Sequence, residues 1–307
     1  LAALAPQTHV FARVPPENKL RPVQALQQNG ITVGMTGDGF NDAPALKAAD
    51  LAIAIGAESA SVARDVADII VDEGEIRAIG DGVEQGRAIT SNIRKAVHFM
   101  IATNLSEILV VLAETVTGDE SVESPLELLW LNLVSDVFPA LGLALEPPER
   151  DLMRRRPRPS GEALLRTRDL RHAFYESLVI GSGALTAHFY GISRYGPTPH
   201  TRTITFMSLV LAQLAHALTC RHDRFEPLGG RALLSNSRLN WALAVSLALQ
   251  AVPFMSGALR RALGIAPLQP GDLAIAGATA LSTFAANEAM LAYRTRRRLP
   301  PPEPPEE

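Results

Sequence analysis

Residues 31–44 read ITVGMTGDGFNDAP, an apolar run that passes directly into a loop of glycine, aspartate and asparagine. The apolar run has the composition of a buried strand. Three further strands are expected at 9–14, 51–55 and 68–71, with helices at 16–28, 43–48 and 59–67. This alternation favours a parallel sheet covered on both faces, which is a doubly wound α/β domain or its second half. Such sheets bind ligands at the carboxyl ends of their strands, where this loop lies.

The loop supplies oxygen ligands and a backbone that a ligand can approach closely. Gly37 and Gly39 permit tight turns, and with Thr36 they are the expected cofactor-binding residues. Asp38 and Asp42 supply the hard oxygen ligands that Mg²⁺ prefers beside a phosphate. An ordinary turn would explain the dipeptides DG or ND alone. The whole string TGDGFNDAP instead indicates a site.

Two further side chains can act on a phosphoryl group. Asn41 can donate to a phosphoryl oxygen, and Lys19, which follows the segment PPEN, can neutralise the negative charge. We therefore expect Lys19, Asp38, Asn41 and Asp42 to be the catalytic residues of this part of the chain.

The string TGDGFNDAPALKAAD resembles the P-type ATPase signature TGDGxNDAPALKxAD, and VPPENKL resembles the lysine-bearing segment upstream of it. The resemblance implies that residues 1–90 form the C-terminal part of a haloacid-dehalogenase-like phosphorylation domain. It also implies that Lys19 contacts an aspartyl phosphate, that Asp38 holds Mg²⁺, and that Asn41 and Asp42 complete the pocket. Phe40 stands where valine is commoner in the family.

The rest of the chain is apolar enough for a membrane. Hydrophobic residues make up 47% of the 307 residues, mean hydropathy is +0.10, and the net charge of −3 does not favour nucleic acid as a partner. A single cysteine excludes an intramolecular disulfide framework and a cysteine-rich metal cluster. Six segments approach the ~20 residues that a membrane span needs, namely 96–117, 126–145, 173–192, 203–220, 239–259 and 273–292.

A soluble helical bundle would need polar faces at helical spacing, and the last two apolar segments lack them. We therefore expect an all-α transmembrane domain of six spans over residues 91–293. The Pro/Glu-rich tail, placed at 294–307, is expected to be disordered.

Arginine is unevenly distributed between the loops, which predicts the orientation. The loops after the second and fourth spans and the tail are rich in arginine, with Arg150, Arg154, Arg155, Arg156, Arg158, Arg166, Arg168, Arg171, Arg221, Arg224, Arg231, Arg238, Arg294, Arg296, Arg297 and Arg298. The opposite loops have only Arg194, Arg202, Arg260 and Arg261. We expect a multi-pass protein of the plasma membrane with its N-terminal block and C-terminus in the cytoplasm.

Polar residues within the first two spans are candidates for a cation site. Asn104 and Glu107 are three residues apart, and Asn132, Ser135 and Asp136 follow the spacing i, i+3 and i+4, so each set shares one helical face. Such groups are costly in a membrane. If the two faces meet, they form an all-oxygen site for a hard cation, without the thiolate that copper or zinc would favour. Asn104 and Ser135 could alternatively serve only in helix packing.

The resemblance extends over these spans. TNLSEI and LLWLNLVSDVFPALGLALEPPERDLMRRRPR resemble the fifth and sixth membrane helices of calcium-pump-like P-type ATPases, which implies that these five residues bind the transported cation. Gln213 stands where the sarcoplasmic-reticulum-type pump has a ligand glutamate, so a charge is lost and a second bound ion is in doubt. Pro139 is expected to break the second span and free carbonyls. His216 is expected to pack between helices, and no spacing predicts a site at His98, His172 or His188.

Residues 74–101 predict a long helix of ~40 Å that leads from the α/β domain into the first span. Such a helix can couple a phosphate pocket to an ion site if the protein has two alternative global states. The sequence has no DKTGT or TGES motif, no nucleotide-binding domain and no first four membrane helices. We therefore expect the C-terminal part of an ATP-driven pump for Ca²⁺, inactive on its own, whose nucleophile and ATP site lie in a missing N-terminal part.

Several alternatives remain open at this point. Oxygen ligands also suit Mn²⁺ or Na⁺, so the transported cation is not fixed. The chain could instead be a non-catalytic membrane subunit or a relic of such a pump. A membrane-anchored phosphatase would also need a nucleophilic aspartate motif, which is absent from the sequence. In the leading interpretation the partners are the lipid bilayer, the inorganic cation and the missing N-terminal part.

Overall fold

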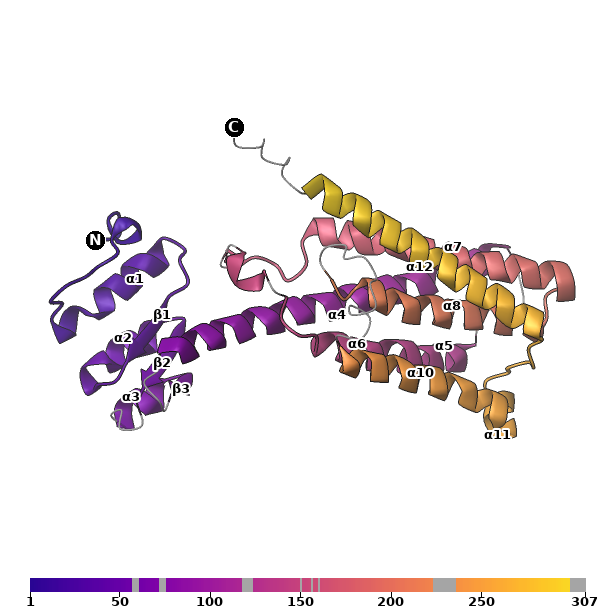
Figure 1. Cartoon of the computed structure of the whole chain (residues 1–307), viewed down its shortest axis with the longest axis horizontal. Coiled ribbons are helices and arrows are strands. Elements are labelled where there is room, and N and C mark those ends of the chain that lie inside the picture. The colour runs from indigo at the N-terminus through magenta and orange to yellow at the C-terminus, as the bar shows by residue number, and fades with distance from the viewer. Residues whose placement is uncertain are drawn as a thin grey trace, which may run out of the picture. The chain divides into compact units, whose positions relative to one another are not determined.

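The computed structural model describes residues 1–56, 61–71, 76–117, 124–149, 151–155, 157–159, 161–222 and 236–298. The chain divides into two compact units. The front unit comprises Leu1–Arg87 with Pro148–Ala163, and the helical unit comprises Ala88–Pro147 with Leu164–Glu307. The element labels below are those of Figure 1.

The front unit contains a small parallel sheet. Its strands are β1 (Gly34–Gly37), β2 (Leu51–Ile55) and β3 (Ile69–Val71), in the order β1-β2-β3. Gly34 lies opposite Leu51, and Ile53 lies opposite Ile69. The parallel pairing follows the predicted alternation of strands and helices, and β2 has the predicted bounds.

Three helices accompany the sheet (Figure 1): α1 (Leu20–Gln28), α2 (Ala43–Ala48) and α3 (Ser61–Val66). A short core joins α2 and α3 to β1 and β2. Leu46, Ala52 and Ala63 are buried there, with Met35 and Val66 packed against them. Because β1 ends next to α2, this packing determines where the loop between them lies.

Residues 9–14 do not form the predicted strand. The segment is exposed up to half-buried Val14, and Arg13 has a φ of 53°, which extended chain does not adopt. A strand is stable only when its backbone groups pair with a neighbouring edge. Within the described residues β1 pairs with β2 alone. The apolar composition of residues 9–14 therefore suggested a strand, but the described chain offers this segment no neighbouring strand with which to pair.

The helical unit is built mainly from long helices. The predicted helix 74–101 belongs to α4, a continuous helix of 42 residues that begins in the front unit; residues 74 and 75 lie outside the described part. The bounds are α4 (Ile76–Thr117), α5 (Pro125–Leu131), a π-helix (Asn132–Val137), α6 (Phe138–Ala144), α7 (Thr167–Tyr195), α8 (Pro199–Thr219), α10 (Ser237–Met255), α11 (Gly257–Ala262) and α12 (Pro270–Arg298).

Helix α8 lies at the centre of the helical unit, beside α7 and α12 (Figure 1). The core there includes fully buried Ile180, Phe206, Val210 and Ala276. Helices α6 and α10 also pack closely, because an added Cβ at Gly142 would lie 2.8 Å from the Cα of Leu239. The Cα of Leu239 belongs to the backbone and cannot move aside as a flexible side chain could. Only glycine therefore fits at position 142, where the two helices cross.

Two predictions of element bounds are wrong. The apolar segment 239–259 is interrupted at Ser256, whose side chain accepts a hydrogen bond from the backbone N–H of Leu259 and so caps a new helix, α11. Residues 294–298, predicted as disordered tail, continue α12, where basic side chains favour a helix C-terminus. The remaining tail residues, 299–307, lie outside the described part.

By length and composition, two helical stretches of the described chain could cross a membrane, Arg77–Val116 and Pro125–Ala144. The other four predicted spans also coincide largely with helices, namely α7, α8, α10 and α12. Six membrane crossings therefore stay a prediction.

Candidate functional site

The loop of the front unit brings Lys19 and Asp42 into direct contact. Lys19 Nζ donates to Asp42 Oδ1 at 2.6 Å, although the residues are 23 positions apart. A short 3₁₀ turn, Phe40–Asp42, leads into α2 and buries Asp42 to 7% exposure. Gly37 makes this arrangement possible, because a Cβ there would lie 2.7 Å from the Cβ of Asp42.

A cavity of about 780 Å³ opens between α1 and β1 at this pair. Its polar lining includes most of the predicted loop site, namely Lys19, Thr36, Gly37, Asp38 and Asp42, and apolar residues such as Phe11, Val23 and Leu26 complete it. Asn41 is exposed, and neither it nor Gly39 lines the cavity. The structure therefore brings together five of the seven predicted loop residues around one space.

The donor set fits Mg²⁺ in part. Mg²⁺ in phosphate sites uses one or two carboxylates and keeps several waters. Asp38 is exposed and faces the cavity, as such a ligand must. Asp42 already holds Lys19 through Oδ1, so it is better placed to position that ammonium group. Among the described residues, no group of three or more histidine, cysteine, aspartate or glutamate side chains could hold a metal ion.

In the helical unit, the predicted faces of α4 and the π-helix meet. Asn104 Nδ2 donates to Asp136 Oδ2 at 2.7 Å. Asp136 is 4% exposed, and within the described chain its second oxygen, Oδ1, has no hydrogen-bond partner. A buried carboxylate oxygen without a partner is costly, so this atom is a candidate ligand atom.

Gln213 of α8 joins the same region from a third helix. Its Nε2 donates to Glu107 Oε1 at 3.0 Å, and Ser135 Oγ donates to Gln213 Oε1 at 2.7 Å. The side chain of Gln213 is completely buried. The amide therefore bridges a carboxylate on α4 and a hydroxyl on the π-helix.

Asn132 was also predicted to be a ligand, but it forms no recorded hydrogen bond with the other side chains of this cluster in the described chain. It is half-buried, and its Nδ2 donates to the carbonyl of Leu128, one turn back in its own helix, at 3.0 Å. Asn132 shares the π-helix with Ser135 and Asp136, so it lies on the same element without contacting either side chain through a hydrogen bond that the structure records.

The predicted local break near Pro139 takes the form of a departure from α-helical geometry, and the predicted release of a carbonyl also has a counterpart. The chain widens into the π-helix and continues as α6, with Pro139 in its first turn. In π-helical bonding the carbonyl of Val134 would need the N–H of residue 139, which proline lacks. Ser246 Oγ of α10 donates to this carbonyl at 2.5 Å. A functional-site π-helix is a recurrent feature of proteins.

The sequence analysis did not predict the partners of two histidines, because it considered residue spacing only within single segments and these partners lie on other helices. His98 Nε2 lies 2.5 Å from Glu176 Oε2, and His188 Nδ1 lies 3.0 Å from Glu114 Oε1. The signal that could have found them was the presence of two further carboxylates within apolar segments. His216 stacks on the ring of Phe99, in keeping with the predicted packing role, and also lies 3.7 Å from Glu176.

The family can now be assigned. The family described as cation transporting ATPase, C-terminus, matches residues 122–292, and the chain belongs to it. Similar curated proteins include a calcium-transporting ATPase of Bacillus subtilis (strain 168), 34% identical over 286 residues, which cover 92% of this chain and 32% of that protein. Calcium-transporting ATPase 1 of Schizosaccharomyces pombe is 30% identical over 290 residues, with 94% and 32% covered.

A mouse relative, calcium-transporting ATPase type 2C member 2 of Mus musculus, is 36% identical over 222 residues, which cover 72% of this chain and 24% of that protein. The chain thus spans about a third or less of the length of these curated relatives.

Proposed function

We propose that this chain is the C-terminal part of an ATP-driven pump that moves Ca²⁺ across a membrane through an aspartyl-phosphate cycle. The observation that carries the proposal is the buried cluster at Asp136, where Asn104 of α4 donates to a carboxylate of the π-helix whose second oxygen has no hydrogen-bond partner in the described chain. The relatives described as calcium-transporting ATPases support Ca²⁺ over Mn²⁺ or Na⁺.

The front unit, in this proposal, is the C-terminal part of a haloacid-dehalogenase-like phosphorylation domain. The helices over residues 91–293 form six membrane spans, with the front unit and the C-terminus in the cytoplasm and the protein in the plasma membrane. Parallel β1, β2 and β3 and the loop at the end of β1 support the first assignment. The two stretches apolar enough to cross a membrane support the second.

At the loop, the residues of this chain would hold and neutralise a phosphoryl group formed on the missing N-terminal part. Lys19 brings an ammonium group to the cavity and Asp42 orients it. Asp38 would hold Mg²⁺, which when bound offsets the negative charge of the phosphoryl oxygens. Asn41, at the surface, would reach the phosphoryl group only in a different rotamer. ATP itself would bind outside this chain.

At the helical cluster, the transported cation and the amide donors would compete for the same oxygens. Ca²⁺ takes 6–8 oxygen ligands, so Asp136, Asn104, Glu107, Ser135 and Asn132 would have to turn their oxygens towards it. The Nδ2 of Asn104 and the Nε2 of Gln213 now hold the two carboxylates. Both amides can present their oxygen instead by rotating. Gln213 brings no charge to the cluster, which favours a single bound ion.

Helix α4 would couple the two sites. It carries Asn104 and Glu107, and its first residues belong to the front unit. A change in phosphorylation state that displaces α4 would alter the contacts of both residues with the π-helix and α8. Such coupling requires two states with different affinity for the ion.

The test is uptake of ⁴⁵Ca²⁺ into inside-out vesicles that contain the full-length parent protein. Asp136→Asn is compared with the wild type and with Ser282→Ala. Ser282 is an exposed serine of α12 whose hydroxyl donates to the carbonyl of Ala278 in the same helix. ATP-dependent uptake should be lost in Asp136→Asn alone. Transport of Mn²⁺ or Na⁺ instead of Ca²⁺ would change the cation. Normal uptake by Asp136→Asn would refute the cluster as the ion site.

A further inference from the structure

Helix α10 presents two polar side chains, four residues apart on one helical face, to the segment that contains the π-helix. Ser246 Oγ donates to the carbonyl of Val134 within the π-helix at 2.5 Å. Gln250 Oε1 accepts from Trp130 Nε1 of α5 at 3.2 Å. Ser246 and Gln250 are 0% and 2% exposed. Trp130 precedes Val134 whereas Gln250 follows Ser246, so the two segments run antiparallel and these contacts hold them in one register.

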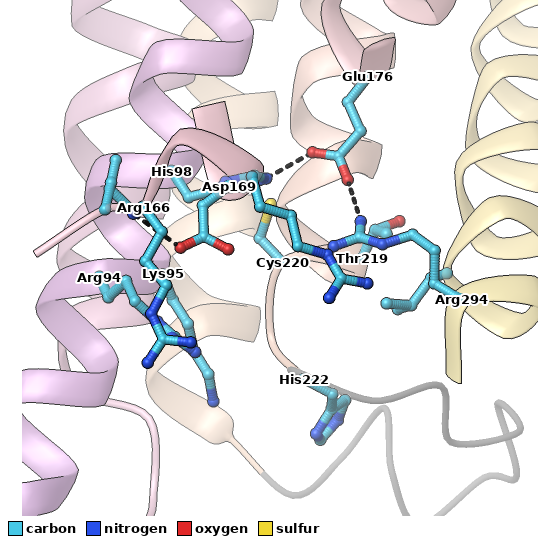
Figure 2. Close-up of a pocket in the computed structure, with 13 residues that line it drawn as sticks. Arg94, Lys95, His98, Arg166, Asp169, Glu176, Thr219, Cys220, His222 and Arg294 are labelled. Carbon is cyan, nitrogen blue, oxygen red and sulfur yellow. Dashed lines mark hydrogen bonds and ion pairs between the residues drawn. The ribbon is translucent and has the colours of Figure 1, made fainter. Parts of the chain in front are cut away.

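The hydrogen bond from Ser246 ends on a backbone atom. Other polar contacts between helices of this unit join two side chains, as His98 and Glu176 do (Figure 2). A contact of that kind orients two side chains, whereas a bond to a carbonyl restrains the path of the backbone. Val134 lies two residues before Asp136, so the bond from Ser246 restrains the backbone from which that carboxylate projects.

The carbonyl of Val134 determines which helical form this segment prefers. In π-helical bonding it would need the N–H of residue 139, and Pro139 has none. In α-helical bonding the same carbonyl would accept from the N–H of Phe138. Val134 is buried, and a buried carbonyl without a donor is unfavourable. Without Ser246 the segment would therefore favour the α-helical pattern, and the Ser246 hydroxyl removes that preference.

The two bonding patterns place Asp136 differently. An α-helix turns by roughly 100° per residue, and a π-helix turns by less because each hydrogen-bonded ring contains one more residue. A change of pattern would rotate Asp136 relative to Asn104 of α4, which now donates to it at 2.7 Å. Ser135 would turn with it, relative to Gln213 of α8. The segment thus has two alternative forms, and only the π-helical form gives the observed cluster.

We propose that Ser246 is a positioning residue of the cation site. It holds Asn132–Val137 in the π-helical form, and Gln250 fixes the register of the two segments. The role in cation binding rests on the proposed function, because the cluster at Asp136 is the proposed cation site. The hydroxyl acts through the backbone carbonyl and is not itself a ligand. Loss of the hydroxyl lowers the fraction of molecules with a binding-competent cluster, and the apparent affinity for the cation falls with that fraction.

The test is the Ca²⁺ dependence of ATP-driven ⁴⁵Ca²⁺ uptake into inside-out vesicles that contain the full-length parent protein. Ser246→Thr and Ser246→Val form a matched pair, because the two new side chains have nearly the same shape and only threonine keeps the hydroxyl. Ser246→Ala removes the hydroxyl without adding volume, and it is compared with the wild type if the added methyl group prevents folding.

The control is Ser208→Ala, which removes a buried polar contact between two other helices. Ser208 Oγ of α8 lies 2.6 Å from Thr279 Oγ1 of α12, and Ser208 is completely buried. This variant should leave the Ca²⁺ concentration for half-maximal uptake unchanged, whatever its effect on the amount of folded protein.

Ser246→Val should raise the Ca²⁺ concentration for half-maximal uptake about two- to tenfold relative to Ser246→Thr, the range that the net free energy of one hydrogen bond allows. The maximal rate should change little, because saturating Ca²⁺ draws the segment back to the form that binds it. A merely structural role of Ser246 would lower the yield or the maximal rate and leave the half-maximal concentrations of the pair equal, which would overturn the proposal.

A second measurement does not depend on transport. Hydrogen exchange of the backbone amides in Asn132–Val137 is followed in the purified full-length parent protein without Ca²⁺ or ATP. The hydrogen bond from Ser246 opposes local opening of this segment. Exchange should therefore be about two- to tenfold faster in Ser246→Val than in Ser246→Thr, again the range set by one hydrogen bond. Equal exchange in the two variants would overturn the proposal.

The two measurements distinguish failure of this role from failure of the pump proposal. If Asp136→Asn abolishes uptake while Ser246→Thr and Ser246→Val have equal half-maximal concentrations, the pump proposal stands and the positioning role is overturned. If the wild type shows no ATP-dependent uptake, or Asp136→Asn transports normally, the pump proposal fails. Faster exchange in Ser246→Val then still supports the hold of Ser246 on the π-helix, and equal exchange overturns it.

Discussion

The two units hold ion pairs of the same chemistry in different surroundings. In the front unit, Lys19 and Asp42 are 2.6 Å apart, and their side chains are 36% and 10% exposed. In the helical unit, Arg221 and Glu146 are 3.2 Å apart, and their side chains are 2% and 4% exposed. Water and salt screen the first pair, whereas the second has protein on every side.

This difference indicates what each pair can do. An open pair beside a cavity can exchange partners with a bound anion at small cost. A buried pair cannot lose one member without leaving a charge in a poorly solvated place. The ion pair of Arg221 and Glu146 therefore links the ends of α8 and α6 by a contact that is costly to break. Asn236, just before α10, also donates to Glu146.

Replacing Arg221 by methionine should destabilise the helical unit by about 3–5 kcal/mol, because Glu146 is left buried without its cation. Unfolding in detergent, followed by helical circular dichroism, measures the change. Arg260→Met, at an exposed position of α11, should have little effect. Adding Glu146→Leu to Arg221→Met should recover much of the loss. If the open pair Lys19–Asp42 were equally sensitive to truncation, the contrast would fail.

Gln213→Leu tests the buried amide that bridges two helices. It should cost about 1–3 kcal/mol, because Glu107 Oε1 loses the buried amide group that donates to it, whereas the Ser135 hydroxyl keeps its bond to the carbonyl of Leu131. The same unfolding measurement applies, and Gln24→Leu at an exposed position of α1 is the matched control. Equal stability of Gln213→Leu and the control would show that other groups satisfy Glu107 and Ser135.

Lys19→Met should lower the stability of the front unit by only about 0.2–1 kcal/mol, because the pair is partly exposed. Hydrogen exchange of the backbone amides in β1 and α2 reports the change locally. Raising the salt concentration to ~1 M should weaken the wild-type pair and leave the variant unaffected, since the Debye length shrinks to ~3 Å. A salt-independent effect of this substitution would place the pair in a drier site than its exposure indicates.

The smallest effect concerns acid pH and the exposed Asp50. The backbone N–H of Val33 donates to Asp50 Oδ2 at 2.9 Å and Gln27 Nε2 donates at 3.2 Å, which holds the pKa of Asp50 below its ordinary value of 3.8. A carboxylate with a lowered folded-state pKa stabilises the fold above 3.8 and loses that contribution as the pH falls through the lowered pKa. Protection of the Val33 amide from exchange should fall in that window, and Asp50→Asn should abolish the dependence.

The parts of the fold that follow local patterns were predictable from sequence. The apolar run at 51–55 forms β2, and alternation of strands and helices indicated parallel pairing. The run at 9–14 is also rich in apolar residues but has no strand neighbour in the described chain, and a local pattern does not reveal whether a neighbour exists. Pairing is a long-range property, and composition does not contain it.

The candidate sites show the same division. Helical spacing placed Asn104 on the face that meets Asp136, and their hydrogen bond is observed. Helical spacing could not reveal that Gln213 would bridge Glu107 and Ser135, because that bridge depends on how α8 is rotated about its axis relative to α4. The π-helix was also missed, since one additional residue per turn leaves no clear sequence signal apart from the nearby proline.

The π-helix has a consequence for the evolution and engineering of this chain. A π-helical segment behaves as an α-helix with one residue inserted, so deleting a residue within Asn132–Val137 would turn everything after it by about 100°. Gly142 would then face away from Leu239, and Glu146 away from Arg221. The inserted residue thus sets how the cluster at Asp136 is rotated relative to the packing surface of α6. Homologous chains that lack it must compensate by shifting one of those two features.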